Sequence, residues 1–316
     1  MKFSSAIARA FFPKKSSPPA QVLWGDSTIA KPAEPLTPAT WETGFTGRAP
    51  DVDWNLVHDM GLHDIGNDPQ EKEPGGYGPR TQGVFHPSAG LHPDGGGCPR
   101  AVLFDLMHAQ RSPTKILTNV LKSMDNGTAR HAGMQKLFVH MAQKRLAGLA
   151  AVYQDVRLSY PPAAIGGSAD MIVVMQSGAV YLIDIKTASP AKFKNLFKPA
   201  WNHILQVNTY MGMAGVKTAY VLTEDRATLE FAKPNSKFRV DFSSTLWDET
   251  LGYCHGMLRT LRTERLPAYD EATCKSNLMF CDYEAVCVAE RRGLAAFGVI
   301  DRRPAEVKKH HLRIIK

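Results

Sequence analysis

Hydrophobic residues recur at regular intervals along much of the chain, beginning near Cys98. In several stretches the residues three and four apart are apolar, which is typical of helices with one buried face. Pro99 suits the first turn of the first of these helices. Asp125-Asn-Gly127 is expected to end the second helix before the third begins. The pattern predicts helices over residues 99–107, 116–124, 128–149, 199–213 and 245–261.

Strand-like segments follow the third predicted helix and recur after the fourth. They are short, rich in β-branched residues, and either alternate with polar residues or run apolar throughout. Gln176-Ser-Gly178 joins two of them with the composition of a hairpin turn. The predicted strands cover residues 151–158, 170–175, 179–185, 219–223 and 238–242. Strands interspersed with helices indicate an α/β fold, a mixed central β-sheet flanked by helices.

Proline and glycine concentrate before this patterned region. The first hundred residues hold 13 of the 21 prolines and 13 of the 25 glycines, a composition that costs much ordering entropy for little burial. We therefore expect an irregular segment at 1–95, a globular domain at 96–290 and a basic tail at 291–316. Scattered aromatic residues would tether the first segment to the domain: Trp24, Trp41, Trp54 and Phe85.

The charge balance indicates which kind of partner the protein would bind. Lys and Arg number 38 against 30 Asp and Glu, a formal net charge of +8. This surplus suits a polyanionic partner such as DNA, although a solvated basic surface is the simpler alternative. No apolar run is long enough to span a membrane, so we expect no membrane partner and a cytoplasmic or nucleoid-associated protein. The chain carries no G-x-x-x-x-G-K-[ST] motif, so a helicase or recombination partner would be a separate protein.

Acidic residues and a lysine meet at the predicted hairpin. Asp170 begins one strand, while Asp184 and Lys186 end the other, which would place both carboxylates side by side. Two carboxylates suit a hard cation that retains water. Asp184 and Lys186 are two residues apart and share one face of the strand. The lysine could therefore position or deprotonate a water molecule beside the metal ion. An ordinary surface pair at a strand end is the alternative.

Further polar residues flank this constellation in a fixed order. Gly127 and His131 lie on the third predicted helix, with Gln135 one turn later. Gly167 precedes Asp170 by three residues, where backbone or substrate would approach closely. Gln206 and Tyr210 are four apart on the fourth predicted helix and so share a face.

This ordered set resembles the PD-(D/E)XK nucleases of the RecB type. Their motifs are a helical G-x-x-x-H, a G-x-x-D, a (D/E)-x-K after a short hairpin and a helical Q-x-x-x-Y, and all four occur here in order within residues 96–290. The resemblance implies a restriction-endonuclease-like core that binds Mg²⁺ or Mn²⁺. The implied metal ligands are Asp170, Asp184, the carbonyl of Ile185 and His131. Gln206 and Tyr210 would orient Lys186 or the DNA strand.

Four of the five cysteines stand near the two ends of the domain: Cys98, Cys274, Cys281 and Cys287. Thiolates in fours indicate an iron–sulfur cluster or structural zinc, and the spacing does not choose between them. One distant cysteine plus a C-terminal triplet resembles the subset of these nucleases in which a 4Fe-4S cluster joins the ends of the domain, including CRISPR-associated RecB-like, AddB-like and phage exonucleases. Six residues separate Cys274 from Cys281, where that subset often has two. Cys254 is expected in the core.

Basic residues with interleaved aromatics follow the lysine motif. Lys192, Lys194 and Lys198, with Phe193 and Phe197, could grip a DNA strand by charge and base stacking. Equally, the phenylalanines could anchor a solvated loop. The leading hypothesis is a metal-dependent DNA exonuclease that acts on DNA ends, preferentially on single strands, with exonuclease activity implied by the resemblance alone. The alternatives are a structure- or sequence-selective endonuclease on the same core and a non-catalytic DNA-binding protein with a structural metal.

Overall fold

The computed structural model describes residues 21–23, 82–109, 111, 118–233, 238–263, 266–277 and 281–292. Most of the predicted irregular segment, with Trp24, Trp41 and Trp54, lies outside these residues, and so does nearly all of the predicted basic tail. Phe85 lies within them and is buried at 1% exposure, where its backbone bridges to Ile165. This aromatic residue therefore tethers its segment to the domain, as expected.

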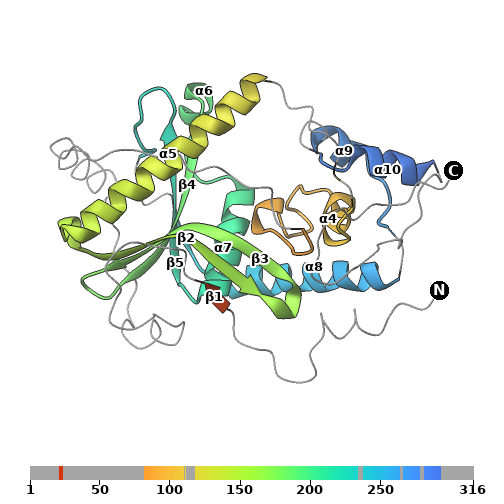
Figure 1. Cartoon of the computed structure of the whole chain (residues 1–316), viewed down its shortest axis with the longest axis horizontal. Helices are drawn as coiled ribbons and strands as arrows, with labels where there is room; N and C mark the ends of the chain where they lie inside the picture. The colour runs from red at the N-terminus through yellow and green to blue at the C-terminus, as the bar shows by residue number, and fades with distance from the viewer. Residues whose placement is uncertain are drawn as a thin grey trace, which may run out of the picture.

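A six-stranded mixed sheet forms the centre of the described part of the chain (Figure 1). The strands follow one another in chain order: β1 (Gln21–Leu23), β2 (Leu149–Tyr160), β3 (Ile165–Met175), β4 (Val180–Ala188), β5 (Thr218–Asp225) and β6 (Arg239–Asp241). Only β4 and β5 pair in parallel, and every other neighbouring pair is antiparallel. The five predicted strands form a mixed sheet as expected, while β1, which lies within the predicted irregular segment, adds a sixth strand beside β2.

Helices cover both faces of this sheet (Figure 1). Seven helices of the described residues have these bounds: α4 (Pro99–Leu106), α5 (Thr118–Gln143), α6 (Pro190–Phe193), α7 (Trp201–Ala214), α8 (Ser244–Arg262), α9 (Glu271–Asn277) and α10 (Glu284–Arg291). The helix α5 packs on one face, and α7 and α8 pack on the other. In β3, Met171 and Val173 belong to the core under α5, whereas Ile172 belongs to the core under α7. Alternation along the strand thus fills two cores at once.

The helix α5 is continuous where a break was predicted. Asp125-Asn-Gly127 lies inside its 26 residues, and the predicted helices 116–124 and 128–149 form one element. A glycine within a helix costs only about 1 kcal/mol, and here Gly127 faces Thr187, which a Cβ would meet at an ordinary 3.7 Å. The helix also ends earlier than predicted, at Gln143. Arg145 then adopts a left-handed backbone (φ 54°), and Leu149 already begins β2.

The two hairpin strands are longer than their apolar stretches. The strand β3 begins at Ile165, so Asp170 lies inside it instead of opening it, and β4 continues past Lys186 to Ala188. The added residues of β3 pair with β2, as in Gly167 opposite Leu158. Hydrogen bonding to neighbouring strands therefore extends both elements beyond what hydrophobic patterning detects.

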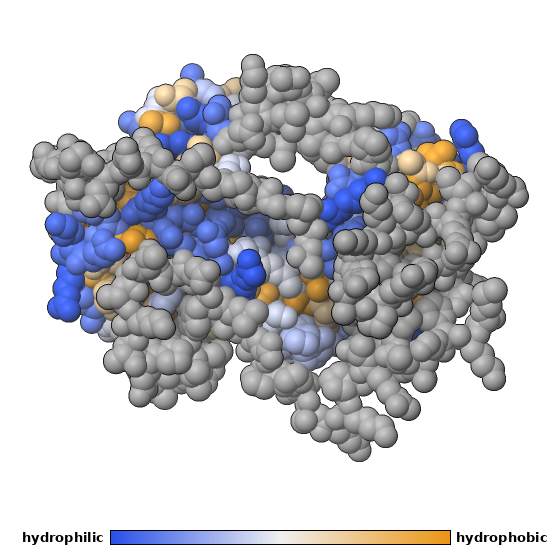
Figure 2. Space-filling view, viewed as in Figure 1, coloured by the Kyte–Doolittle hydropathy of each residue, from blue (hydrophilic) through white to orange (hydrophobic). Residues whose placement is uncertain are grey.

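The start of the domain packs against its C-terminal helices (Figure 1). Phe104 of α4 and Val286 of α10 share a small buried cluster with Tyr283, separate from the two cores of the sheet. Figure 2 shows the molecule in the same orientation. The described surface near the C-terminal end of α5 is mostly hydrophilic, whereas the described surface near α9 and α10 carries both hydrophilic and hydrophobic residues. No helix of the described chain is long and apolar enough to cross a membrane.

Candidate active site

Asp170 and Asp184 come together on the neighbouring strands β3 and β4. The ladder pairs Met171 with Ile183, which places the two acids next to each other at the following position. Oδ2 of Asp170 accepts a hydrogen bond of 2.7 Å from the backbone N–H of Ile185. Strand pairing therefore fixes the first carboxylate against the backbone that follows the second.

Lys186 completes this pair from the same strand. Its Nζ lies 2.8 Å from both carboxylate oxygens of Asp184. The residues are two apart on β4, so both side chains leave the same face. The Asp184 side chain is 2% exposed, whereas that of Lys186 is 22% exposed. The ammonium group thus lies between a buried acid and the surface from which a substrate would approach.

His131 reaches the acids from α5. Its Nδ1 lies 3.5 Å from Oδ2 of Asp170, and both side chains are 20% exposed. The neighbouring Arg130 forms an ion pair with the fully buried Glu224 of β5, with Nε 2.9 Å from Oε2. This pair anchors α5 across the sheet and so holds His131 over Asp170.

Gln135 links the same helix to the backbone of Asp170. Its Nε2 donates to the carbonyl of Asp170 at 2.9 Å and to Oδ1 of Asp155 at 3.0 Å. Asp155 of β2 has a left-handed backbone (φ 46°), which is unusual within a strand. Sequence reasoning singled out Gln135 but missed Asp155, which only the pairing of β2 with β3 brings to the site.

The two acids have opposite pKa shifts. Burial works to raise the pKa of Asp170, but the hydrogen bond and charge of His131, the charge of Lys186 and the N–H of Ile185 outweigh it and lower the pKa below its ordinary value. For Asp184, burial raises the pKa to about 6, against the attraction of Lys186 and with the repulsion of Asp170. Asp170 is therefore ionised across the neutral range, whereas Asp184 gains its charge near pH 6.

The start of α7 also faces the site. Burial, with the positive charge of Lys186, lowers the pKa of His203 to about 4, so this imidazole is neutral near pH 7. Sequence reasoning missed His203, although it lies three residues before the predicted Gln206. Gln206 is half-buried on the same helix.

Tyr210 joins α7 to β3. A Cβ on Gly167 would lie 3.1–3.2 Å from the Tyr210 ring and hydroxyl and 3.0 Å from Pro87. The close approach of Pro87 and Tyr210 therefore favours a glycine three residues before Asp170. Two of the predicted motifs are in direct contact here.

A divalent cation fits the donor set around the acids. Oδ2 of Asp184 and Nδ1 of His131 are buried, and beyond their charged contacts with Lys186 and Asp170 neither has a hydrogen-bond partner among the described residues. Within the described residues no three His, Cys, Asp or Glu side chains meet closely enough to hold a metal ion. A cation here would therefore rest on the two carboxylates together with backbone oxygen and water, a mode that Mg²⁺ accepts.

The predicted basic loop follows β4, but its first part, with Lys192 and Phe193, forms the short helix α6. Lys192, Lys194 and Lys198 are all exposed. Phe197 is 69% exposed, whereas Phe193 is half-buried. Trp201, at the start of α7, is 43% exposed and was missed from the sequence; its indole packs edge-on against His92 with ring centroids 6.0 Å apart. Exposed aromatic and cationic side chains therefore occur together between the end of β4 and the start of α7.

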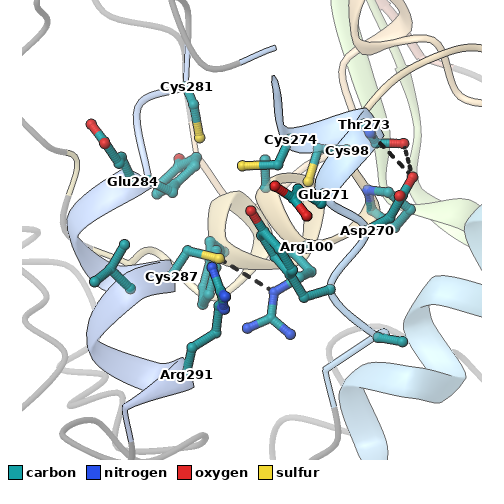
Figure 3. A pocket seen from close by; sticks show the side chains of 17 residues that line it. Cys98, Arg100, Asp270, Glu271, Thr273, Cys274, Cys281, Glu284, Cys287 and Arg291 are labelled. Carbon is teal, nitrogen blue, oxygen red and sulfur yellow. Dashed lines mark hydrogen bonds between the residues drawn. The ribbon is translucent and has the colours of Figure 1, made fainter. Parts of the chain in front are cut away.

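The four predicted cysteines line one cavity of about 280 Å³ between α4, α9 and α10 (Figure 3). The sulfur atoms of Cys98, Cys274, Cys281 and Cys287 point into this shared space, and all four are free thiols. Burial raises the pKa of the Cys281 thiol, and the other three sulfurs add to the effect. The fifth cysteine, Cys254, is fully buried in the sheet core, as predicted.

No protein-family model and no curated protein matches this sequence. Among solved structures, the chain is similar to an alkaline exonuclease, LHK-Exo, from Laribacter hongkongensis, with 16% identity and a TM-score of 0.42 over 58% of this chain and 90% of the other. LHK-Exo in complex with dAMP gives 17% identity and a TM-score of 0.40 over 58% and 90%. SSO0001 gives 13% identity and a TM-score of 0.40 over 77% and 98%.

Proposed function

We propose that this protein is a Mg²⁺- or Mn²⁺-dependent nuclease that hydrolyses phosphodiester bonds at DNA ends, with a preference for single strands. The observation that carries the proposal is the convergence of Asp170, Asp184 and Lys186 on two paired strands, with Lys186 Nζ 2.8 Å from Asp184. The preference for ends rests on the ordered motifs that this chain shares with RecB-type nucleases.

Each residue of the site has a defined part in this reaction. Asp170, Asp184 and the carbonyl of Ile185 would hold the metal ion together with water. His131, the further ligand that the resemblance implies, lies 3.5 Å from Asp170 but does not form a three-side-chain group with the two acids in the described residues. The ion, when bound, supplies Lewis-acid stabilisation of the charge that develops on the phosphate. Lys186 would hold the attacking water by donating a hydrogen bond from its Nζ, which lies at the partly exposed edge of the acid pair. It would take up the water's proton only after its own ammonium proton has passed to the solvent.

The surroundings of Lys186 favour its role in holding the attacking water. His203 is neutral near pH 7 and so adds no charge beside Lys186, and Tyr210 packs closely against Gly167, which holds α7 on β3. The Gln206–Tyr210 helix is therefore proposed to orient the lysine or the strand being cut.

We also propose that the cysteines carry a 4Fe-4S cluster. The support for one shared site is that all four cysteines line the same cavity and direct their sulfurs into it (Figure 3). Four thiolates can hold either a zinc ion or an iron–sulfur cluster. The choice of the cluster rests on the resemblance of the cysteine arrangement to that of the cluster-bearing RecB-type nucleases.

DNA would reach the acids along the basic loop. Lys192, Lys194 and Lys198 neutralise phosphates, and the exposed rings of Phe197 and Trp201 offer faces for unpaired bases. Stacking of this kind requires bases that are not already paired, which is the structural argument for a single-strand preference.

The substrate experiment uses three DNAs of one sequence: linear single-stranded, linear double-stranded and covalently closed circular. With Mg²⁺ or Mn²⁺ the protein should degrade linear single strands fastest, leave the closed circle intact and stop when a chelator is added. Cutting of the closed circle would establish the endonuclease alternative. Binding without cutting under every metal condition would establish the non-catalytic alternative.

A further inference from the structure

Arg100 is the second residue of α4 and follows Cys98 by two positions. Its side chain is 7% exposed, which is unusual for an arginine, and it lies at the wall of the cysteine cavity (Figure 3). Burying a guanidinium is costly unless each of its donors finds a partner. The partners of Arg100 therefore reveal what the burial achieves.

All three nitrogens of the guanidinium are directed at the C-terminal part of the domain. Nε donates to Sγ of Cys287 at 3.4 Å, and Nη1 donates to the carbonyl of Pro267 at 2.8 Å. Nη2 forms an ion pair with Glu290, one turn after Cys287 on α10. Arg100 thus contacts the Cys287 sulfur, the segment that precedes α9, and α10, the helix that carries Cys287.

We propose that Arg100 is a positioning residue that sets the reduction potential of the cluster through its hydrogen bond to Cys287. The inference rests on the proposed cluster. Hydrogen bonds to cysteine sulfur, and nearby positive charge, stabilise the more negative reduced form of an iron–sulfur cluster and raise its potential. The pairing with Glu290 aims Nε at the sulfur while it offsets part of the positive charge.

Other charged groups around the cavity provide the controls. Arg291 also lines it, but its guanidinium lies over the Tyr269 ring, 3.6 Å from the centroid. Glu271 and Glu284 add negative charge, and the Tyr269 hydroxyl interacts with Cys274. Arg291→Gln therefore removes the same charge as Arg100→Gln from the same cavity but leaves the hydrogen bond to Cys287 in place.

The test is a redox titration of the anaerobically purified full-length protein, followed by visible absorption and electron paramagnetic resonance. Iron and acid-labile sulfide are measured first in every variant. Arg100→Gln should lower the reduced-to-oxidised ratio at the wild-type midpoint about tenfold, which is 59 mV for one electron. Arg100→Lys keeps the charge but loses the N–H fork, so its shift should be intermediate. Glu290→Gln should shift the potential upwards, and Arg291→Gln should shift it least among the charge-removing changes.

Two results would overturn the inference: a wild-type potential in Arg100→Gln with full iron content, or equal shifts in Arg100→Gln and Arg291→Gln. If Arg100→Gln loses the cluster on purification, the opposite shifts of Arg100→Lys and Glu290→Gln decide the question. Wild-type protein without iron and sulfide would instead refute the cluster, and with it this role of Arg100. Nuclease activity in that same preparation would leave the proposed reaction standing.

Discussion

The acid–lysine site and the cysteine cavity are built in opposite ways. Asp170, Asp184 and Lys186 lie within 16 residues of one another on two strands of one hairpin, so local pairing brings them together. The cavity gathers Cys98 with three cysteines more than 170 residues later, and it depends on α4 packing against α10. The acid–lysine site can form as soon as its hairpin forms. The cysteine cavity forms only when α4 has packed against the C-terminal helices, so it requires the whole domain to be folded.

This difference predicts that the two regions can be disabled separately. The acids are held by the sheet and by α5, through Ile185, His131 and Gln135. The cavity is held by α4, α9 and α10 and has its own small apolar cluster. Changes in one region should alter the other only through the stability of the domain.

The largest expected effect is the loss of cleavage on Lys186→Met. Methionine keeps the apolar stem but removes the group that holds the attacking water and handles its proton, so the rate constant of cleavage should fall about 10²–10⁴-fold. Visible absorption of the cluster should not change. Single-turnover cleavage of end-labelled DNA, with the absorption spectrum of the same sample, measures both. A Lys186→Met protein that cleaves at the wild-type rate would remove the lysine from the mechanism.

Cys287→Ser is the reciprocal change. It should abolish the visible absorption of the cluster and lower the melting temperature by several degrees, because the cluster no longer joins α10 to α4. The acids remain in place, so the Cys287→Ser protein that is folded should still bind Mn²⁺. Parallel metal analysis, thermal melting and Mn²⁺ titration test the separation; loss of Mn²⁺ binding in a folded Cys287→Ser protein would contradict it.

The pH dependence of metal affinity should follow Asp184. Because its folded pKa is raised to about 6, the carboxyl is neutral below that pH and must lose a proton to bind a cation. Metal affinity should therefore fall by up to about tenfold per pH unit below pH 6 and level off above it. For the same reason the metal-free protein should lose stability as the pH rises from the unfolded pKa of Asp through 6. Mn²⁺ titrations from pH 5 to 8 measure the first effect, and a flat profile would refute it.

The smallest effects concern the two motif glycines. Gly167→Ala places a methyl 3.0–3.2 Å from Pro87 and Tyr210, and should destabilise the protein by about 1–2 kcal/mol. Gly127→Ala, with its nearest contact at 3.7 Å in α5, should stabilise it by up to about 1 kcal/mol. Denaturant unfolding of the two variants gives the free energies. Equal destabilisation by both would show that the close approach of Pro87 and Tyr210 is not what favours Gly167.

Local chemistry was the predictable part of this molecule. The hairpin turn predicts that Asp170 and Asp184 lie side by side. The two-residue spacing of Asp184 and Lys186 places both side chains on one face of the strand. The α/β class and most elements follow from periodicity for the same reason. The break at Asp125-Asn-Gly127 was predicted wrongly because packing of α5 on the sheet outweighs the weak helix propensity of three residues.

Residues contributed by distant segments escaped the sequence. His203 faces Lys186 only because α7 crosses the end of β4, and Asp155 meets Gln135 only because β2 pairs with β3. Neither position carries a local signal that separates it from any other histidine or aspartate. The contact of Arg100 with Cys287 spans 187 positions and depends on the packing of α4 against α10 in the same way.

The most direct test of the acid–lysine site compares Asp184→Asn with Asp248→Asn. Asp248 is an exposed carboxylate of α8, outside the site, so the control makes the same chemical change without touching the acid pair. Cleavage of end-labelled single-stranded DNA is measured with Mn²⁺ titration of the same samples. Asp184→Asn should lose both Mn²⁺ binding and cleavage, while Asp248→Asn should retain both. An Asp184→Asn protein that degrades DNA as fast as Asp248→Asn would show that the chemistry lies elsewhere.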